Sequence, residues 1–310
     1  MKFGFSLIVR GNDATPETFR QVAQRAETRE LDALWLSAHV IIPPQTKSGY
    51  VMIPGLKHPP HWHERYWEPF TILGYLAAVT SRIRLGTSVL VLPQHNPFEV
   101  AKQVAEIDQL SNGRRDFGVG AGWFEEEFEV LGQSFANRGP RLTEALELID
   151  ALWKPDPVTY EGQFYQVKDA YFGPKPVQSG NPPIWIAGGS KTAMRRAARF
   201  ADVFHPVRLL PEAIPEITRT LGDLCEEYGR ARDAVKIGVK VQLEFTGQPT
   251  AEGQFPTQGR AQDIVDAIRR YQDAGVEHLV FDVAPEKREV LLDTIERFAD
   301  EVRPHFTKST

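Results

Sequence analysis

Two glycine-rich segments of this sequence have the residue types needed to hold a large planar ligand and its phosphate. In residues 112–123, a turn and a short apolar strand lead into Gly120-Ala121-Gly122. In residues 183–190, an apolar strand runs through Gly188 and Gly189 directly into a predicted helix. Glycine lets the backbone approach a flat ligand closely, and a helix N-terminus binds anions. Together the two segments predict a cofactor that spans several strand ends.

His39 is the residue best suited to proton transfer, because it directly follows a short apolar run at residues 33–37. An imidazole has an ordinary pKa of about 6.5, so it can gain or lose a proton near neutral pH. The alternative interpretation is a hydrogen-bonded loop histidine without a chemical role. No Ser-His-Asp arrangement and no paired carboxylates stand out at the predicted strand ends, so hydrolysis is poorly supported.

Three histidines and a glutamate lie close together at residues 58–64 and could in principle bind zinc. Two prolines stiffen their spacing, however, and no predicted helix or strand presents the ligands. We therefore predict no metal ion and interpret the segment as part of a loop over a substrate pocket. A barrel hydrolase built on this cluster is the rival hypothesis. The single cysteine, Cys225, excludes an intrachain disulfide and is interpreted as a packing residue.

Strands and helices alternate along nearly the whole chain. The apolar runs are continuous, which is typical of a parallel sheet covered by helices. About eight strand and helix units favour a closed (β/α)8 TIM barrel over an open sheet, with ligands at the C-terminal ends of the strands. The predicted strands are residues 3–9, 33–37, 84–92, 116–119, 184–187, 202–206, 236–245 and 278–283. The predicted helices are residues 16–30, 97–111, 138–153, 191–200, 211–228, 261–274 and 287–302.

The domain prediction is a single TIM-barrel domain over residues 1–310, with insertions at about residues 41–68, 155–181 and 246–259. Long insertions in such folds tend to be lids or binding loops. Within the second insertion, apolar residues on both sides of Glu161-Gly162 predict a hairpin. The acidic run Glu125-Glu126-Glu127 is interpreted as a solvated helix start that complements the helix dipole.

Composition limits the class of partner. The formal net charge of -5 and the pI of about 6.0 give no reason to expect nucleic acid or an anionic membrane. No apolar run approaches the roughly 20 residues that a membrane span needs, so we expect a cytoplasmic protein. A small-molecule organic substrate is the expected partner.

The sequence resembles the bacterial luciferase-like superfamily of flavin- and deazaflavin-dependent oxidoreductases over nearly its whole length. It is most similar to the subgroup described as probable F420-dependent oxidoreductases. Each motif alone is unspecific, but together they are specific. The motifs that carry the resemblance are residues 80–87, 92–97, 101–103, 108–114, 118–123, 127–128, 131–132, 138–139, 174–176 and 184–190.

This resemblance implies a TIM barrel that holds coenzyme F420, with FMN as the alternative cofactor. It implies a non-proline cis peptide at Ser88-Val89, behind the ring, and a histidine at His39 near the reactive edge of the ring. It also implies that the protein forms a homodimer. Lys191 or Arg195 could assist in binding the phosphate. The cofactor-binding residues implied by the resemblance and by the two glycine segments are His39, Thr87, Ser88, Val89, Gly120, Gly122, Trp123, Ala187, Gly188, Gly189 and Ser190.

Three activities remain open at this point. The first is hydride transfer between F420 and an organic substrate, and the second is oxygen activation by a monooxygenase that uses reduced FMN. The third is a flavin-binding barrel without catalysis. Trp123 stands where the sugar-phosphate dehydrogenases of the superfamily have an acidic proton donor, which puts a sugar-phosphate substrate in doubt.

Overall fold

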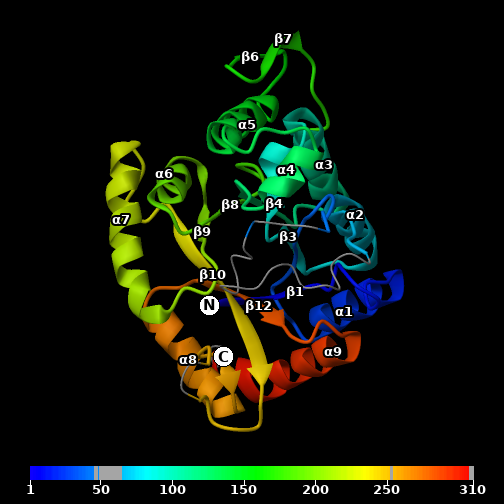
Figure 1. Cartoon of the computed structure of the whole chain (residues 1–310), viewed down its shortest axis with the longest axis vertical. Coiled ribbons are helices and arrows are strands. Elements are labelled where there is room, and N and C mark those ends of the chain that lie inside the picture. Colours follow the sequence, from blue (N-terminus) through cyan, green and yellow to red (C-terminus); the bar gives the residue numbers. More distant parts are fainter. Residues whose placement is uncertain (45–47, 49–64, 252–253, 307–310) are drawn as a thin grey trace.

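A closed barrel of eight parallel strands forms the centre of the protein (Figure 1). The computed structural model describes residues 1–44, 48, 65–251 and 254–306. The barrel strands are β1 (Lys2–Ser6), β2 (Ala33–Leu36), β3 (Arg84–Thr87), β5 (Arg115–Gly120), β8 (Ile184–Ala187), β9 (Val203–His205), β10 (Lys236–Phe245) and β12 (His278–Val283). Pairing of Lys236 with Val203 closes the sheet between β10 and β9. The predicted fold is confirmed.

Helices cover the outside of the barrel because each presents an apolar side to the strands. They are α1 (Pro16–Thr28), α2 (Pro69–Val79), α3 (Pro97–Leu110), α4 (Glu125–Val130), α5 (Arg138–Leu152), α6 (Lys191–Phe200), α7 (Ile214–Glu227), α8 (Ala261–Asp273) and α9 (Arg288–Arg297). Proline in the first turn follows a capping side chain at three of them, where Thr15, Glu68 and Asn96 accept hydrogen bonds from helix N–H groups. No helix is predicted for residues 69–79, yet they form α2.

Several predicted boundaries differ from the structure, and the strand predicted for residues 3–9 ends at Ser6. The run at residues 84–92 is not one strand, because the chain leaves β3 at Ser88 and continues as β4 (Leu90–Val91), which pairs with β5. The helix predicted for residues 287–302 ends at Arg297 and is followed by a π-helical turn (Phe298–Val302).

The interior of the barrel is filled by two tryptophans. The rings of Trp35 and Trp185 lie 4.2 Å apart between centroids, and both side chains are 2% exposed. Their size requires glycine on neighbouring strands, since a Cβ on Gly86 would lie 2.3 Å from Trp35 and one on Gly238 would lie 2.6 Å from Trp185. Trp185 is therefore a core residue, as its strand position predicts.

The second insertion contains the predicted hairpin. Strand β6 (Val158–Glu161) pairs antiparallel with β7 (Gln166–Ala170), and the pair projects beyond α5 at one end of the molecule (Figure 1). Glu144 of α5 fixes the turn, because its Oε1 accepts hydrogen bonds from the backbone N–H groups of Phe164 and Tyr165 at 2.7 and 2.8 Å. In the third insertion, β11 (Gln258–Gly259) pairs with the end of β10. The first insertion lies mostly outside the described residues.

Candidate active site

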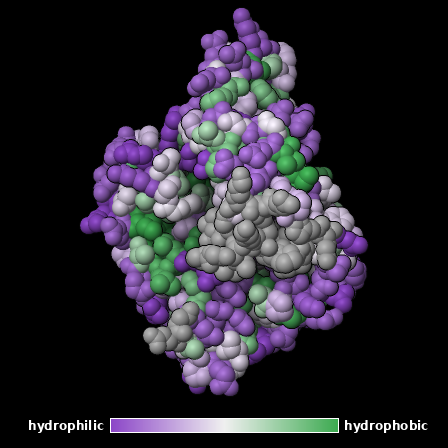
Figure 2. Space-filling model, in the orientation of Figure 1, coloured by the Kyte–Doolittle hydropathy of each residue, from purple (hydrophilic) through white to green (hydrophobic). Residues whose placement is uncertain are grey.

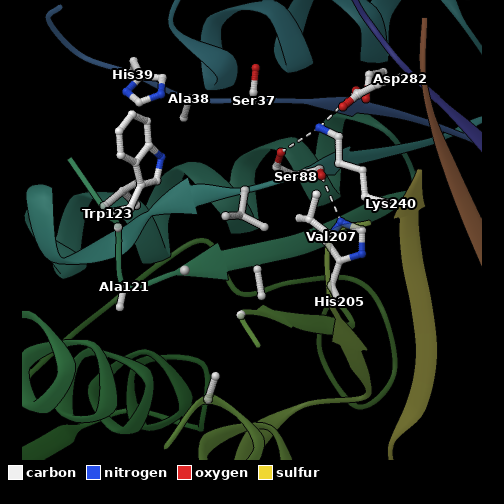
Figure 3. A pocket seen from close by; sticks show the side chains of 18 of the residues that line it. Ser37, Ala38, His39, Ser88, Ala121, Trp123, His205, Val207, Lys240 and Asp282 are labelled. Atoms are coloured by element: carbon white, nitrogen blue, oxygen red, sulfur yellow. Dashed lines mark hydrogen bonds and ion pairs between the residues drawn. The ribbon is translucent and has the colours of Figure 1, made fainter. Parts of the chain in front are cut away.

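A cavity of about 670 Å³ lies at the C-terminal ends of the barrel strands. Residues that lie on or directly after β1, β2, β3, β5, β8, β9, β10 and β12 all contribute to its lining. The outer margin of the molecule is mostly hydrophilic in this view, and a patch of hydrophobic residues lies left of the centre (Figure 2). In the cavity, His39 and Trp123 lie on one side, and Ser88, His205, Lys240 and Asp282 lie on the other (Figure 3). This volume is in the usual range for small-molecule sites.

His39 is held by a carboxylate from a distant part of the chain. Its Nδ1 lies 2.8 Å from Oε2 of Glu127, whose side chain is 0% exposed. The other carboxylate oxygen, Oε1, accepts hydrogen bonds from the backbone N–H groups of Val40 and Ile41 at 2.7 and 3.2 Å. One carboxylate therefore fixes both the imidazole of His39 and the backbone that follows it.

The charge of Glu127 determines which nitrogen of His39 carries a proton. Burial alone would raise the pKa of Glu127, but the hydrogen bond and the attraction from His39, together with hydrogen bonds from Gln94 and Val40, outweigh it. The pKa stays below its ordinary value, so Glu127 is ionised and can only accept. Nδ1 of His39 must then be protonated, and Nε2 is the nitrogen that can accept or donate a further proton.

The interpretation of residues 125–127 as a solvated acidic helix start is wrong for Glu127. Glu125 is exposed, as expected, and Glu126 accepts hydrogen bonds from the N–H and hydroxyl groups of Ser48. Glu127 instead lies on the inner side of α4, next to the buried Phe128. The spacing of Phe124, Glu127 and Phe128 places all three on one face of the helix, and this signal was available in the sequence.

The peptide bond between Ser88 and Val89 is cis, as the resemblance implies. The hydroxyl of Ser88 lies 2.9 Å from Nε2 of His205, and Nδ1 of His205 lies 2.7 Å from the carbonyl oxygen of Gly238. A carbonyl oxygen only accepts, so Nδ1 carries the proton. Burial lowers the pKa of His205 to about 4. Its ring is therefore neutral near pH 7, and Ser88 donates its hydroxyl hydrogen to Nε2.

Glycines let β5 lie against the segment that contains the cis peptide. A Cβ on Gly120 would lie 2.9 Å from Cγ2 of Val89. Gly122 has a φ of +84°, and a Cβ there would lie 2.6 Å from Val91. Both glycines line the cavity. Side chains at these positions would push the wall of the cavity inward, which is why the sequence has glycine here.

The part of the cavity at the start of α6 has the features of an anion site. Ser190 caps α6 by accepting a hydrogen bond from the N–H of Ala193, and Gly188, Ser190 and Thr192 line the cavity at this helix N-terminus. Arg196 lines the same region and is 8% exposed, with hydrogen bonds to the Thr143 hydroxyl and the Gly139 carbonyl oxygen. Among the described residues, no carboxylate lies within ion-pair distance of its guanidinium.

A buried guanidinium without a carboxylate partner attracts an anion, because its burial is otherwise uncompensated. Burial lowers the pKa of Arg196. The helix dipole of α6 adds to the attraction at the same place. The residues present therefore fit the phosphate of a flavin-like cofactor.

The comparison with known families identifies the chain. The profile of the luciferase-like monooxygenases matches residues 1–251. The chain belongs to the luciferase-like monooxygenase family. It is thus an enzyme of an oxidoreductase family, and the resemblance found in the sequence is confirmed.

Relatives of this luciferase-like protein include both deazaflavin and flavin enzymes. An uncharacterized protein of Mycobacterium tuberculosis is 32% identical over 222 residues, which cover 68% of this chain and 78% of that protein. The F420-dependent glucose-6-phosphate dehydrogenase of Amycolatopsis mediterranei is 33% identical over 196 residues, 61% of this chain and 53% of that enzyme. The oxygenase component of the flavin-dependent trigonelline monooxygenase of Acinetobacter baylyi is 32% identical over 164 residues, 52% of this chain and 45% of that protein.

The barrel also resembles solved structures of the same architecture. An F420-dependent secondary alcohol dehydrogenase in complex with an F420-acetone adduct superposes with a TM-score of 0.78 at 17% identity, covering 99% of both chains. At this identity the likeness supports the fold.

Most of the predicted site residues of this luciferase-like protein meet at one cavity. Two do not line it. Thr87 is fully buried behind the wall, where its hydroxyl bonds to the Gly118 carbonyl oxygen and accepts from the Gly118 N–H, and Gly189 is exposed outside the cavity. Arg195 points away and pairs with Glu227 at 3.0 Å. The predicted residues that line the cavity are His39, Ser88, Val89, Gly120, Gly122, Trp123, Ala187, Gly188 and Ser190.

The cavity also contains residues for which no role is predicted from the sequence, chiefly His205, Lys240, Asp282, Arg138 and Arg196. The histidine cluster at residues 58–64 lies outside the described residues. Within the described part of the chain, no group of three or more histidine, cysteine or acidic side chains is arranged to bind a metal ion. In the same part, every helix is too short or too polar to cross a membrane.

Proposed function

We propose that the protein is a deazaflavin-dependent oxidoreductase that transfers a hydride between coenzyme F420 and a small organic substrate. One observation carries the proposal. A single cavity joins a proton-transfer side chain, His39, to an anion-binding end at Ser190 and Arg196. A cofactor with a redox ring and a phosphate needs these two features in one site.

Two further observations support a deazaflavin. The relative from Amycolatopsis mediterranei uses F420 and shares 33% identity over 61% of this chain. Cationic side chains also gather around the N-terminus of α6, where Arg138 and Arg196 line the cavity and Lys191 is exposed beside it. A deazaflavin has an acidic tail beyond its phosphate, and these cations would complement it.

The residues of the chain have separable tasks. Ser190 and the N–H groups at the start of α6 would hold the phosphate, with Arg196 supplying positive charge. Gly120, Gly122 and the Ser88-Val89 peptide would leave a flat surface for the ring. The bound ring would supply the hydride chemistry. His39 would exchange a proton with the substrate through Nε2, while Glu127 keeps Nδ1 protonated.

A second candidate is a monooxygenase that uses reduced FMN. It is favoured by the relative from Acinetobacter baylyi, which is a flavin-dependent oxygenase component with 32% identity over 52% of this chain. The same cavity, His39 and anion-binding end would serve this cofactor.

Binding measurements with both cofactors separate the candidates. Titration of the purified protein with F420 and with FMN, each in both oxidation states, should show saturable binding of F420 at lower concentration than FMN. H39A should retain binding and lose turnover, since His39 lies at the reacting side and not at the phosphate. Tight binding of reduced FMN with weak binding of F420 would support the monooxygenase. Binding of a cofactor with unchanged turnover in H39A would remove the role of His39.

A further inference from the structure

A lysine and an aspartate form an ion pair inside the cavity. Nζ of Lys240 lies 3.1 Å from Oδ1 of Asp282, and the two side chains are 10% and 30% exposed. Both line the cavity, on the adjacent strands β10 and β12. Nζ also lies 3.5 Å from the carbonyl oxygen of Ser88, which belongs to the cis peptide (Figure 3). The pair thus touches the part of the wall that would support the redox ring.

The charges of this pair affect the cavity more strongly than charges at the surface would. Lys240 is largely removed from water and Asp282 partly so, and the fields of these charges are therefore less screened. The neighbouring ring of His205 is neutral near pH 7, because burial lowers its pKa to about 4. Arg10 and Glu286, which also line the cavity, form a further balanced pair. Loss of either Lys240 or Asp282 would therefore change the net charge of the cavity by one unit.

We propose that Lys240 and Asp282 set the relative affinity of the cavity for the oxidised and the reduced forms of the cofactor. This inference rests on the proposed function. Reduction of the ring by a hydride adds two electrons and one proton, so the reduced ring carries one more negative charge until it takes up a second proton. A cation beside the ring favours the reduced form, and an anion disfavours it. In the intact pair, the effect of Lys240 on the reduced form opposes the effect of Asp282.

The chain offers a matched control pair on the same two strands. Lys236, at the start of β10, pairs with Glu277, just before β12, at 3.3 Å between Nζ and Oε1. This pair lies four residues back along β10 from Lys240, about 13 Å away at the usual rise of a strand. Its side chains are 44% and 50% exposed. Loss of either partner changes the net charge of the protein by one unit, as at Lys240 or Asp282, but does not change the charge of the cavity lining.

The test measures the dissociation constants of oxidised and reduced F420 for each variant, by anaerobic equilibrium dialysis at mildly alkaline pH. Both forms carry the same phosphate, so an effect of a substitution on phosphate binding cancels in the ratio of the two constants. K240M should lower the preference for the reduced form by about tenfold, and D282N should raise it by about tenfold. K240R, K236M and E277Q should each stay within about twofold of the unmodified protein.

The outcomes separate the two proposals. If neither form of F420 binds to the unmodified protein, the proposed function is wrong, whether or not FMN binds. If the cofactor binds and K240M and D282N shift the ratio in the same direction, or leave it unchanged, the pair has a purely structural role and the inference is overturned. Midpoint temperatures of the apo-protein variants show separately whether each one folds.

Discussion

Replacement of Glu127 by glutamine tests the central contact of the site. The side chain keeps its size, and its remaining Oε1 can still accept from the N–H groups of Val40 and Ile41. It now presents an NH2 group to Nδ1 of His39, 2.8 Å away in the unmodified protein. Two donors cannot share this contact, so the proton of His39 should move from Nδ1 to Nε2.

The expected loss follows from the type of bond removed. A hydrogen bond to a charged group contributes about 1.5–3 kcal/mol, and the two backbone bonds are retained, so E127Q should lose about 2 kcal/mol of unfolding free energy. Because the pKa of Glu127 is lowered on folding, its contribution is present above the ordinary pKa of 4.5 and is lost as pH falls further. The stability difference between E127Q and the unmodified protein should therefore shrink below about pH 4.5.

Two measurements check this prediction. Denaturant unfolding across pH gives the stability difference, and ¹⁵N NMR of the imidazoles reports the tautomer, with H39A used to assign the resonance. General acid and base catalysis typically contributes 10² to 10⁴-fold, so turnover of E127Q should fall by about that factor. Because Glu127 acts through His39, the double variant E127Q/H39A should be no slower than H39A alone.

An unchanged tautomer in E127Q together with unchanged turnover would refute this reasoning. So would a double variant whose loss is the product of the two single losses, since the residues would then act independently.

Three further predictions concern the rest of the cavity. His205 has a pKa of about 4 in the folded protein and 6.5 when unfolded, so its neutral ring contributes to the free energy of unfolding above pH 6.5. About 3 kcal/mol of this contribution is lost as the pH falls to 4. H205N should flatten this part of a curve of stability against pH. G188A places a Cβ 2.7 Å from that of Ala193 at a φ of +137°, and it should weaken cofactor binding at least about tenfold when measured by calorimetry. G189A is the control, because a Cβ there meets open space and should leave binding unchanged. R196M should reduce the rise in midpoint temperature caused by the cofactor, while R195M, which loses only a surface ion pair, should leave it unchanged.

The barrel could be predicted because its signals are local. The local patterns are apolar runs, proline in a first helical turn and glycine at the end of a strand. These patterns predict the strands and the glycines that line the cavity. His39 was identifiable for the same reason, since it follows a strand. The break after β3 was recognised as a cis peptide only through the family resemblance, because Ser88 and Val89 are ordinary strand residues.

The partners of these residues could not be predicted, because they come from distant parts of the chain. Glu127 lies 88 residues from His39, and Ser88 lies 117 residues from His205. An acidic run at a helix start gives no indication of which carboxylate is buried unless the neighbouring phenylalanines are considered. The role of Lys240 likewise depends on strand register, which places it beside β12 and not on the surface.

The packed indoles of Trp35 and Trp185, whose planes are tilted by 55°, have a consequence for kinetics. They fill the barrel axis beneath the cavity, so nothing can pass through the barrel from one end to the other. The proposed cofactor and its reactant would therefore use the same face of the molecule to enter and to leave. If the ring lies beneath the reactant, it must arrive first and depart last, so the two should bind in a compulsory order.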